Sequence, residues 1–144
     1  MTFTEAPPDF KKEVDVVACF VQHDGKFVLL HHQRHKTHGN TFGLPAGKVD
    51  SGETIQQAIG REIKEETGLD IAEENIIYVS SVFVRNQGHD IHYHAFETHL
   101  PTKPEIRISP NEHKGYMWVT PDEALKMDLI HDLDECITTY FGMK

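Results

Sequence analysis

The sequence has few cysteines and no long hydrophobic run. Its two cysteines, Cys19 and Cys136, are too far apart in the chain to read as a metal-ligand pair, and nothing requires an oxidising compartment. The longest apolar run, residues 16–21, is far shorter than the roughly 20 apolar residues of a membrane-spanning helix. The N-terminus carries several acids and no hydrophobic stretch, so we expect no signal peptide and a cytoplasmic location.

Positive charge is also scarce. The chain has 14 Lys and Arg against 23 Asp and Glu, and 14 − 23 gives a formal net charge of −9. Binding to a nucleic-acid polymer or to an anionic membrane needs a basic surface, so neither is expected. A small polyanionic ligand remains compatible with this charge, because a bound metal ion reverses the local electrostatics.

The length of 144 residues predicts a single domain over residues 1–144, with no room for an appended module. Residues 1–9 contain two prolines and predict a loose leader. The remaining pattern alternates between strand and helix periodicity, and its order predicts a mixed sheet with helices packed on it. Strands are expected at 14–21, 27–30, 76–84, 90–100 and 116–119, and helices at 54–67, from 120 onward and at 131–141.

The helix expected at 54–67 has acids where its buried face should continue. Its first half carries an apolar stripe of Ile55, Ala58 and Ile59. On a helical wheel the same stripe continues into Glu62, Glu65 and Glu66. Such charge runs are usually solvated, but these like charges repel one another and replace apolar residues. They call for a counter-cation, and oxygen ligands suit Mg²⁺ or Mn²⁺.

A further acid, on a predicted strand, shares its face with apolar neighbours. Alternation over residues 91–99 places Glu97 on the same side as Tyr93 and Ala95. Glu97 is interpreted either as an ordinary acid near the end of an edge strand or as a fourth oxygen ligand.

The segment 47–69 matches a complete family signature. Read along the chain, it comprises Gly47, Glu53, Arg61-Glu62-Ile63, Glu65-Glu66 and Gly68-Leu69. This is the pattern G-x5-E-x7-R-E-U-x-E-E-x-G-U, which is typical of the Nudix hydrolases. Segments 40–46 and 112–119 resemble the family's lead-in and closing strand. Phe42 stands where Trp is common in the family, and Ala46 where a second glycine is common.

The resemblance implies the Nudix fold, an α/β/α sandwich around a mixed β-sheet. It implies metal-dependent hydrolysis of a nucleoside diphosphate linked to another group X, with Mg²⁺ or Mn²⁺ and two or three ions when substrate is bound. The metal would be held by the three helix acids named above, with the carbonyl of Gly47 and with Glu97 completing the shell. Arg61 would orient the cluster by ion pairing, and Glu53 would support the loop and helix. Such a reaction depends mainly on positioning and on stabilising negative charge.

Two acids are candidates for the general base. Glu62 belongs to the signature, and Glu112 lies in a loop flanked by Pro and Gly. Of the two, Glu62 is narrowly favoured as the general base.

Four histidines enter the long loop: His31, His32, His35 and His38. Their spacing matches no zinc-site pattern. They and Arg34 are interpreted as contacts to substrate phosphate or as solvated residues. Phe42 is a candidate for stacking on a base, as are the strand aromatics, whose simpler role is the core.

Two alternatives remain open. The same chemistry would serve to clear oxidised nucleoside triphosphates, and a Nudix-like domain can also bind a ligand without catalysis. The partner expected in all cases is a small nucleotide derivative. A homodimer is compatible with the sequence, although no hydrophobic stripe indicates one.

Overall fold

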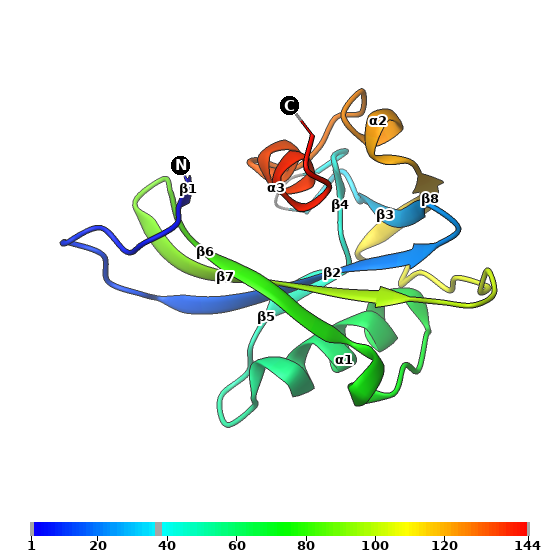
Figure 1. The fold of residues 1–144 in the computed structure, drawn as a ribbon, viewed down its shortest axis with the longest axis horizontal. Coiled ribbons are helices and arrows are strands. Elements are labelled where there is room, and N and C mark those ends of the chain that lie inside the picture. The colour runs from blue at the N-terminus through cyan, green and yellow to red at the C-terminus, as the bar shows by residue number, and fades with distance from the viewer. Residues whose placement is uncertain (1, 37–38, 144) are drawn as a thin grey trace.

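The computed structural model describes residues 2–36 and 39–143, which form one mixed sheet with helices on both faces (Figure 1). The strand order is β1-β6-β7-β2-β3-β4, with β5 also pairing with β2 and β8 with β3. Strands β2 and β7 run parallel, and the other pairs are antiparallel. The strands are β1 Thr2–Phe3, β2 Val14–His23, β3 Lys26–His32, β4 Phe42–Gly43, β5 Ala46–Lys48, β6 Ile77–Asn86, β7 His89–His99 and β8 His113–Val119. The helices are α1 Ile55–Thr67, the 3-10 turn η1 Glu73–Asn75, α2 Pro121–Ala124 and α3 Leu133–Tyr140.

Helix α1 covers one face of the sheet, and α2 and α3 cover the other (Figure 1). Alternation along β2 supplies both cores. Val17 and Cys19 pack with α1, whereas Ala18 and Phe20 pack with α3. The expected α/β/α sandwich with a mixed β-sheet is confirmed.

Short-range signals determine the turns and the main helix. Asp24 and Gly25 both have positive φ, as the two-residue turn between β2 and β3 requires. At α1, Thr54 and Gln57 form the expected capping box, and Gly68 closes the helix in the left-handed conformation. No helix among the described residues is long and apolar enough to cross a membrane.

The structure differs from the expected elements in two places. Thr2 and Phe3 pair with Val84 and Phe83 at the edge of β6, so the start of the expected loose leader is part of the sheet. The last helix is shorter than expected and begins at Leu133, after Asp132 in the left-handed conformation. The glycines and prolines of residues 31–53 predict either a long loop or short strands joined by loops, and the second holds, because β4 and β5 pair with β3 and β2.

Candidate active site

Glu62 and Glu66, two of the three helix acids predicted to bind metal, are buried one helical turn apart on α1. Their residues are 8% and 6% exposed, and their carboxyl groups share a hydrogen bond. The Oε1 atom of Glu66 also accepts a hydrogen bond from the backbone N–H of Ala46 at 2.9 Å. Glu65 lies at the rim, with its side chain 57% exposed. The helix therefore directs two of the three predicted metal ligands into the protein and leaves the third beside them at the surface.

Gly47 on β5 lies directly against the Glu62 carboxylate. A β-carbon added to Gly47 would come within 3.0 Å of all three carboxyl atoms of Glu62, a separation that real β-carbons do not adopt. The absence of a side chain at position 47 is thus what admits the carboxylate. This contact places the backbone of Gly47, predicted to offer its carbonyl, beside the predicted helix ligands.

Arg61 donates hydrogen bonds to three acids and so fixes the arrangement of the predicted metal ligands. Its Nε and Nη2 atoms donate to the two carboxylate oxygens of Glu53 at 2.8 and 2.9 Å. Its Nη1 atom donates to Glu62 at 2.6 Å and to Glu65 at 3.3 Å. The paired guanidinium holds the pKa of Glu53 down at about 2, and hydrogen bonding to Glu53 raises the pKa of Arg61. Glu53 thus fixes the arginine that contacts the metal-ligand candidates.

Too little positive charge surrounds Glu62 and Glu66 for both carboxyl groups to be ionised together. Burial, followed by the neighbouring charge of Glu62, raises the pKa of Glu66 to about 9. Burial likewise raises the pKa of Glu62, although Arg61 opposes the effect. Adjacent carboxyl groups with raised pKa values are typical of sites that work with a cation. The oxygen donors gathered beside Gly47 therefore fit a hard divalent ion such as Mg²⁺ or Mn²⁺.

Glu112 lies on the loop that leads into β8 and is exposed. Its carbonyl accepts a hydrogen bond from the Gln33 N–H at 2.8 Å, which ties this loop to the end of β3. Its negative charge acts on Glu66, whose pKa it raises in addition to the larger effect of burial. The structure therefore brings the second general-base candidate within electrostatic reach of the buried pair.

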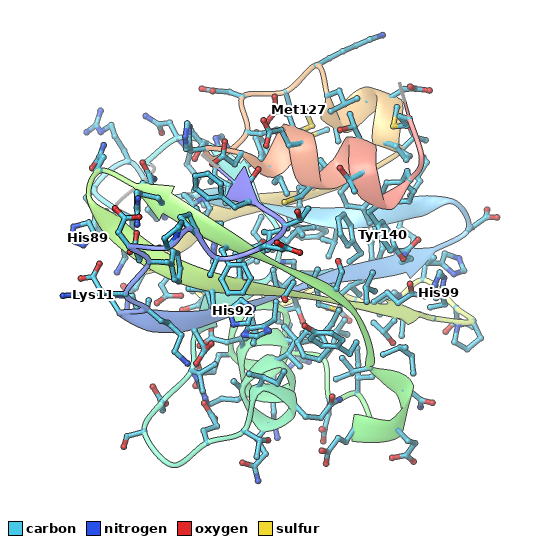
Figure 2. All side chains as sticks on the ribbon, turned by 60° about the vertical axis from the view of Figure 1, so that its left-hand side comes forward. Lys11, His89, His92, His99, Met127 and Tyr140 are labelled. Carbon is cyan, nitrogen blue, oxygen red and sulfur yellow. The ribbon has the colours of Figure 1, made fainter. Side chains whose placement is uncertain are left out.

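Glu97 does not join this group. It accepts a hydrogen bond from the hydroxyl of Tyr140 on α3 at 2.8 Å and pairs with His99 at 2.9 Å. Its neighbour Phe96 packs in the core beneath α1, so Glu97 faces the opposite side of the sheet, where α3 carries Tyr140, labelled in Figure 2. The alternation of residues 91–99 correctly placed Glu97 on one face with Tyr93 and Ala95, but the helix that packs on that face is α3. The geometry does not support Glu97 as a fourth ligand beside the α1 acids.

The histidines at the start of the long loop make local contacts. His31 stacks on Phe42 with ring centroids 4.0 Å apart, which covers one face of that aromatic ring. His32 bonds through Nδ1 to the carbonyl of Thr41 at 3.0 Å. Arg34 and His35 are exposed, and His38 lies outside the described residues.

A cavity of about 400 Å³ lies between the sheet and α3, a feature that the sequence alone did not predict. Residues from β2, β6, β7, α3 and the N-terminal segment line it, including Phe20, Ser80, Tyr93, Ala95 and Tyr140. Its volume is within the range of small-molecule sites. The sequence predicts either a core role or base stacking for the strand aromatics, and two of them, Phe20 and Tyr93, line this cavity.

A row of small side chains on the α3 face of the sheet runs from Ala46, whose backbone N–H contacts Glu66, toward the cavity. The strand registers align Ala46, Ala18, Ala95 and Ser80 across four neighbouring strands. Ala46 is the residue that donates to Glu66, and Ala95 and Ser80 line the cavity. Two strand spacings separate Ala46 from Ala95, roughly 10 Å. A ligand of nucleotide size can span this distance.

Comparisons with known proteins agree with this geometry. A model of the NUDIX domain family matches residues 11–140. CTP pyrophosphohydrolase of Escherichia coli strain K12 is 31% identical over 118 residues, covering 82% of this chain and 84% of that protein. The NAD-capped RNA hydrolase NudC of Vibrio atlanticus is 44% identical over 61 residues, which are 42% of this chain and only 21% of that enzyme.

Solved structures share the fold. The solution structure of the E. coli ORF135 protein has a TM-score of 0.74 at 27% identity, covering 91% of this chain and 90% of that one. A MutT protein from Methanosarcina mazei Go1 has a TM-score of 0.79 at 22% identity, covering 92% and 95%, and its likeness concerns the fold alone. With the complete signature, the buried acid pair on α1 and a family match over residues 11–140, the chain belongs to the Nudix family of pyrophosphohydrolases.

Proposed function

We propose that this chain hydrolyses the pyrophosphate linkage of a nucleoside diphosphate linked to another group X, using Mg²⁺ or Mn²⁺. The observation that carries the proposal is the buried pair of Glu62 and Glu66, held against Gly47. A purely structural role explains poorly why two carboxyl groups share an interior position, since burying charge is costly. A metal-dependent hydrolase needs this concentration of oxygen ligands.

Glu62, Glu65 and Glu66 would hold the metal, with the backbone carbonyl of Gly47 as a further donor. A bound divalent ion neutralises charge on phosphate oxygens and activates water. The family resemblance suggests two or three ions when substrate is present. The exposed position of Glu65 suits a ligand that engages only when substrate and ion arrive together.

Arg61 positions the metal-ligand carboxylates rather than reacting itself. Its double hydrogen bond to Glu53 leaves Nη1 directed at Glu62 and Glu65. Such paired contacts fix direction as well as distance. The acids therefore face the reacting phosphates in a defined arrangement.

Glu62 is our choice for the general base, with Glu112 as the alternative. Burial raises the pKa of Glu62, which makes it a better proton acceptor near neutral pH. Glu112 is exposed on its loop, where its backbone bonds to Gln33 and Ser109, and an exposed carboxylate there is accessible to a bound phosphate. Substituting each by Gln separates them, because loss of the base lowers kcat and removes the corresponding limb of the pH profile.

The cavity beside α3 would receive the nucleoside. Phe20 and Tyr93 supply aromatic surface, and the small side chains from Ala46 to Ser80 leave room for a chain of phosphates. The group X can be a third phosphate, as the name of the E. coli relative, CTP pyrophosphohydrolase, implies for that enzyme. Nucleoside triphosphates are therefore the first substrates to test.

A panel of nucleotides with Mg²⁺ and with Mn²⁺ tests the proposal. It includes the triphosphates, their 8-oxo forms, ADP-ribose and dinucleotides, with nucleoside monophosphate and phosphate products measured. Release of a nucleoside monophosphate from at least one class supports the hydrolase. Preference for 8-oxo forms would assign the clearance role, and tight binding with no product from any member would favour a ligand-binding module.

A further inference from the structure

A second cluster of ligand-type side chains lies away from the α1 acids. The Oδ1 atom of Asp15 on β2 is 3.0 Å from Nε2 of His94 and 3.6 Å from Nδ1 of His92, both on β7. One ligand atom from each residue lies within 4.8 Å of the others. In residues 2–36 and 39–143 this is the one group of three such side chains that converges so closely.

The two separations from Asp15 suit a tetrahedral ion. Ligand atoms around Zn²⁺ lie roughly 3.3 Å apart when each bond is about 2.0–2.1 Å. The two measured distances from Asp15 bracket that value. A small inward shift of His92 would complete a three-ligand set with a fourth position open to water.

In each imidazole, the ring nitrogen that does not face Asp15 has a hydroxyl partner. The other ring nitrogen of His92, Nε2, bonds to the hydroxyl of Ser81 at 2.9 Å. The other ring nitrogen of His94, Nδ1, lies 3.4 Å from the hydroxyl of Tyr78. Metal-ligating histidines almost always have such a partner, because it fixes the tautomer and the ring orientation. His92 also stacks on Phe83 with centroids 4.4 Å apart, which restricts its rotation.

The cluster lies on the α1 side of the sheet, where Figure 2 shows the labelled His92. In the strand registers His94 is opposite Val17, and Val17 is opposite Gly47. The Val49 N–H also donates to the carbonyl of Asp15 at 3.0 Å. An ion at the cluster would thus connect β7 to β2, the strand that holds β5 and its Gly47 in place.

We propose that Asp15, His92 and His94 form a transition-metal site of the Zn²⁺ class, separate from the Mg²⁺ or Mn²⁺ site on α1. Two imidazoles and one carboxylate favour such ions, whereas Mg²⁺ prefers oxygen ligands alone. Lys12 contacts the other oxygen of Asp15 at 3.0 Å, but its side chain is 51% exposed and leaves Oδ1 available. The site would stabilise the pairing of β2 and β7 and requires no assumption about the substrate.

The competing explanation is a hydrogen-bonded network without an ion. His94 would donate from Nε2 to Asp15 and accept from Tyr78 at Nδ1, and His92 would bond through Nε2 to Ser81. That network binds no Zn²⁺, so the two explanations differ in a direct measurement.

Calorimetric titration of the whole chain with Zn²⁺ tests the proposal, with affinity tags removed and excess Mg²⁺ occupying the α1 acids. We expect one Zn²⁺ per chain and a rise in Tm on binding. The variants His92→Ala and Asp15→Asn should lose about tenfold or more in affinity, and Ser81→Ala about tenfold, the range found for outer partners of metal ligands. Co²⁺ substitution should give the visible absorption of a tetrahedral site in the wild type.

Two controls assign the ion to this cluster. His99→Ala removes an exposed histidine of the same strand that pairs with a single acid, Glu97, and it should leave Zn²⁺ affinity unchanged. The double variant Glu62→Gln, Glu66→Gln should also retain the Zn²⁺ site. No Zn²⁺ binding by the wild type, or equal losses in His99→Ala, or loss only in the double variant, would overturn the assignment.

Discussion

The carboxylate of Glu62 occupies the space that a β-carbon on Gly47 would need. Gly47→Ala should therefore push Glu62 away from Glu66 while leaving the sheet paired, since position 47 has no need of a positive φ. A displacement of about 1 Å in a catalytic group can reduce turnover about 100-fold. We expect a loss of that order in kcat, measured in steady state with Mg²⁺.

The matched control is Gly60→Ala on the same helix. A β-carbon at Gly60 meets nothing within 4 Å, so it should leave kcat unchanged. It should also stabilise the protein by up to about 1 kcal/mol, because alanine favours the helix. Equal activity in the two variants would show that the contact between Gly47 and Glu62 has no role in catalysis.

Arg61→Lys keeps the charge but loses the double hydrogen bond to Glu53. Since Arg61 also contacts Glu62 and Glu65, we expect metal affinity or kcat to fall by about 10- to 100-fold. A Mg²⁺ titration of the initial rate separates the two effects.

Arg85→Lys is the corresponding control. Arg85 forms a similar double contact with Asp90, at 2.7 and 3.1 Å, at the other end of the sheet. Its replacement should leave the Mg²⁺ dependence as in the wild type. A loss as large as that of Arg61→Lys would mean that the first result reflects general destabilisation.

Ala95→Leu should fill part of the cavity between β7 and α3. We expect kcat/KM for nucleotides to fall by roughly 10- to 200-fold, the usual effect of steric changes in a binding pocket. Hydrolysis of an alkyl pyrophosphate without a base should be unaffected, and the exposed substitution Ala72→Leu should change neither. If both substrates are affected alike, the cavity is not the nucleoside site.

His113 makes the stability of the protein depend on pH. Burial, together with the nearby charges of His32 and Lys36, lowers its pKa from 6.5 to about 4. The unfolded chain takes up this proton between those values while the folded chain does not, so the contribution is complete above pH 6.5 and is lost as the pH falls toward 4. The loss is at most about 3 kcal/mol. Urea unfolding of wild type and His113→Leu between pH 4 and 7 should show a weaker dependence in the variant, and parallel curves would contradict this.

Local signals in the sequence were enough to predict much of the fold. The turn at Asp24 and Gly25 and the caps of α1 each depend on residues within a few positions. Apolar periodicity likewise predicted the helix that carries Glu62 and Glu66, and their burial agrees with their place on the apolar stripe.

Features that depend on long-range pairing could not be predicted. Alternation showed which residues share a face with Glu97, but only the docking of α3 decides that this face meets Tyr140. Asp15 and His94 are far apart in the chain, and the parallel register of β2 and β7 brings them together. The cavity likewise exists only once α3 covers the sheet and Thr2–Phe3 pair with the edge of β6.

The central claim is that the acids of α1 form a catalytic metal site. The most direct test is hydrolysis of a nucleoside triphosphate by the wild type, Glu65→Gln and Glu66→Gln, with Mg²⁺ and with a chelator, alongside circular dichroism to monitor the fold. We predict that the chelator abolishes hydrolysis and that both variants lose most of their turnover while remaining folded. Hydrolysis that persists in the chelator, or unchanged turnover in both variants, would contradict the account.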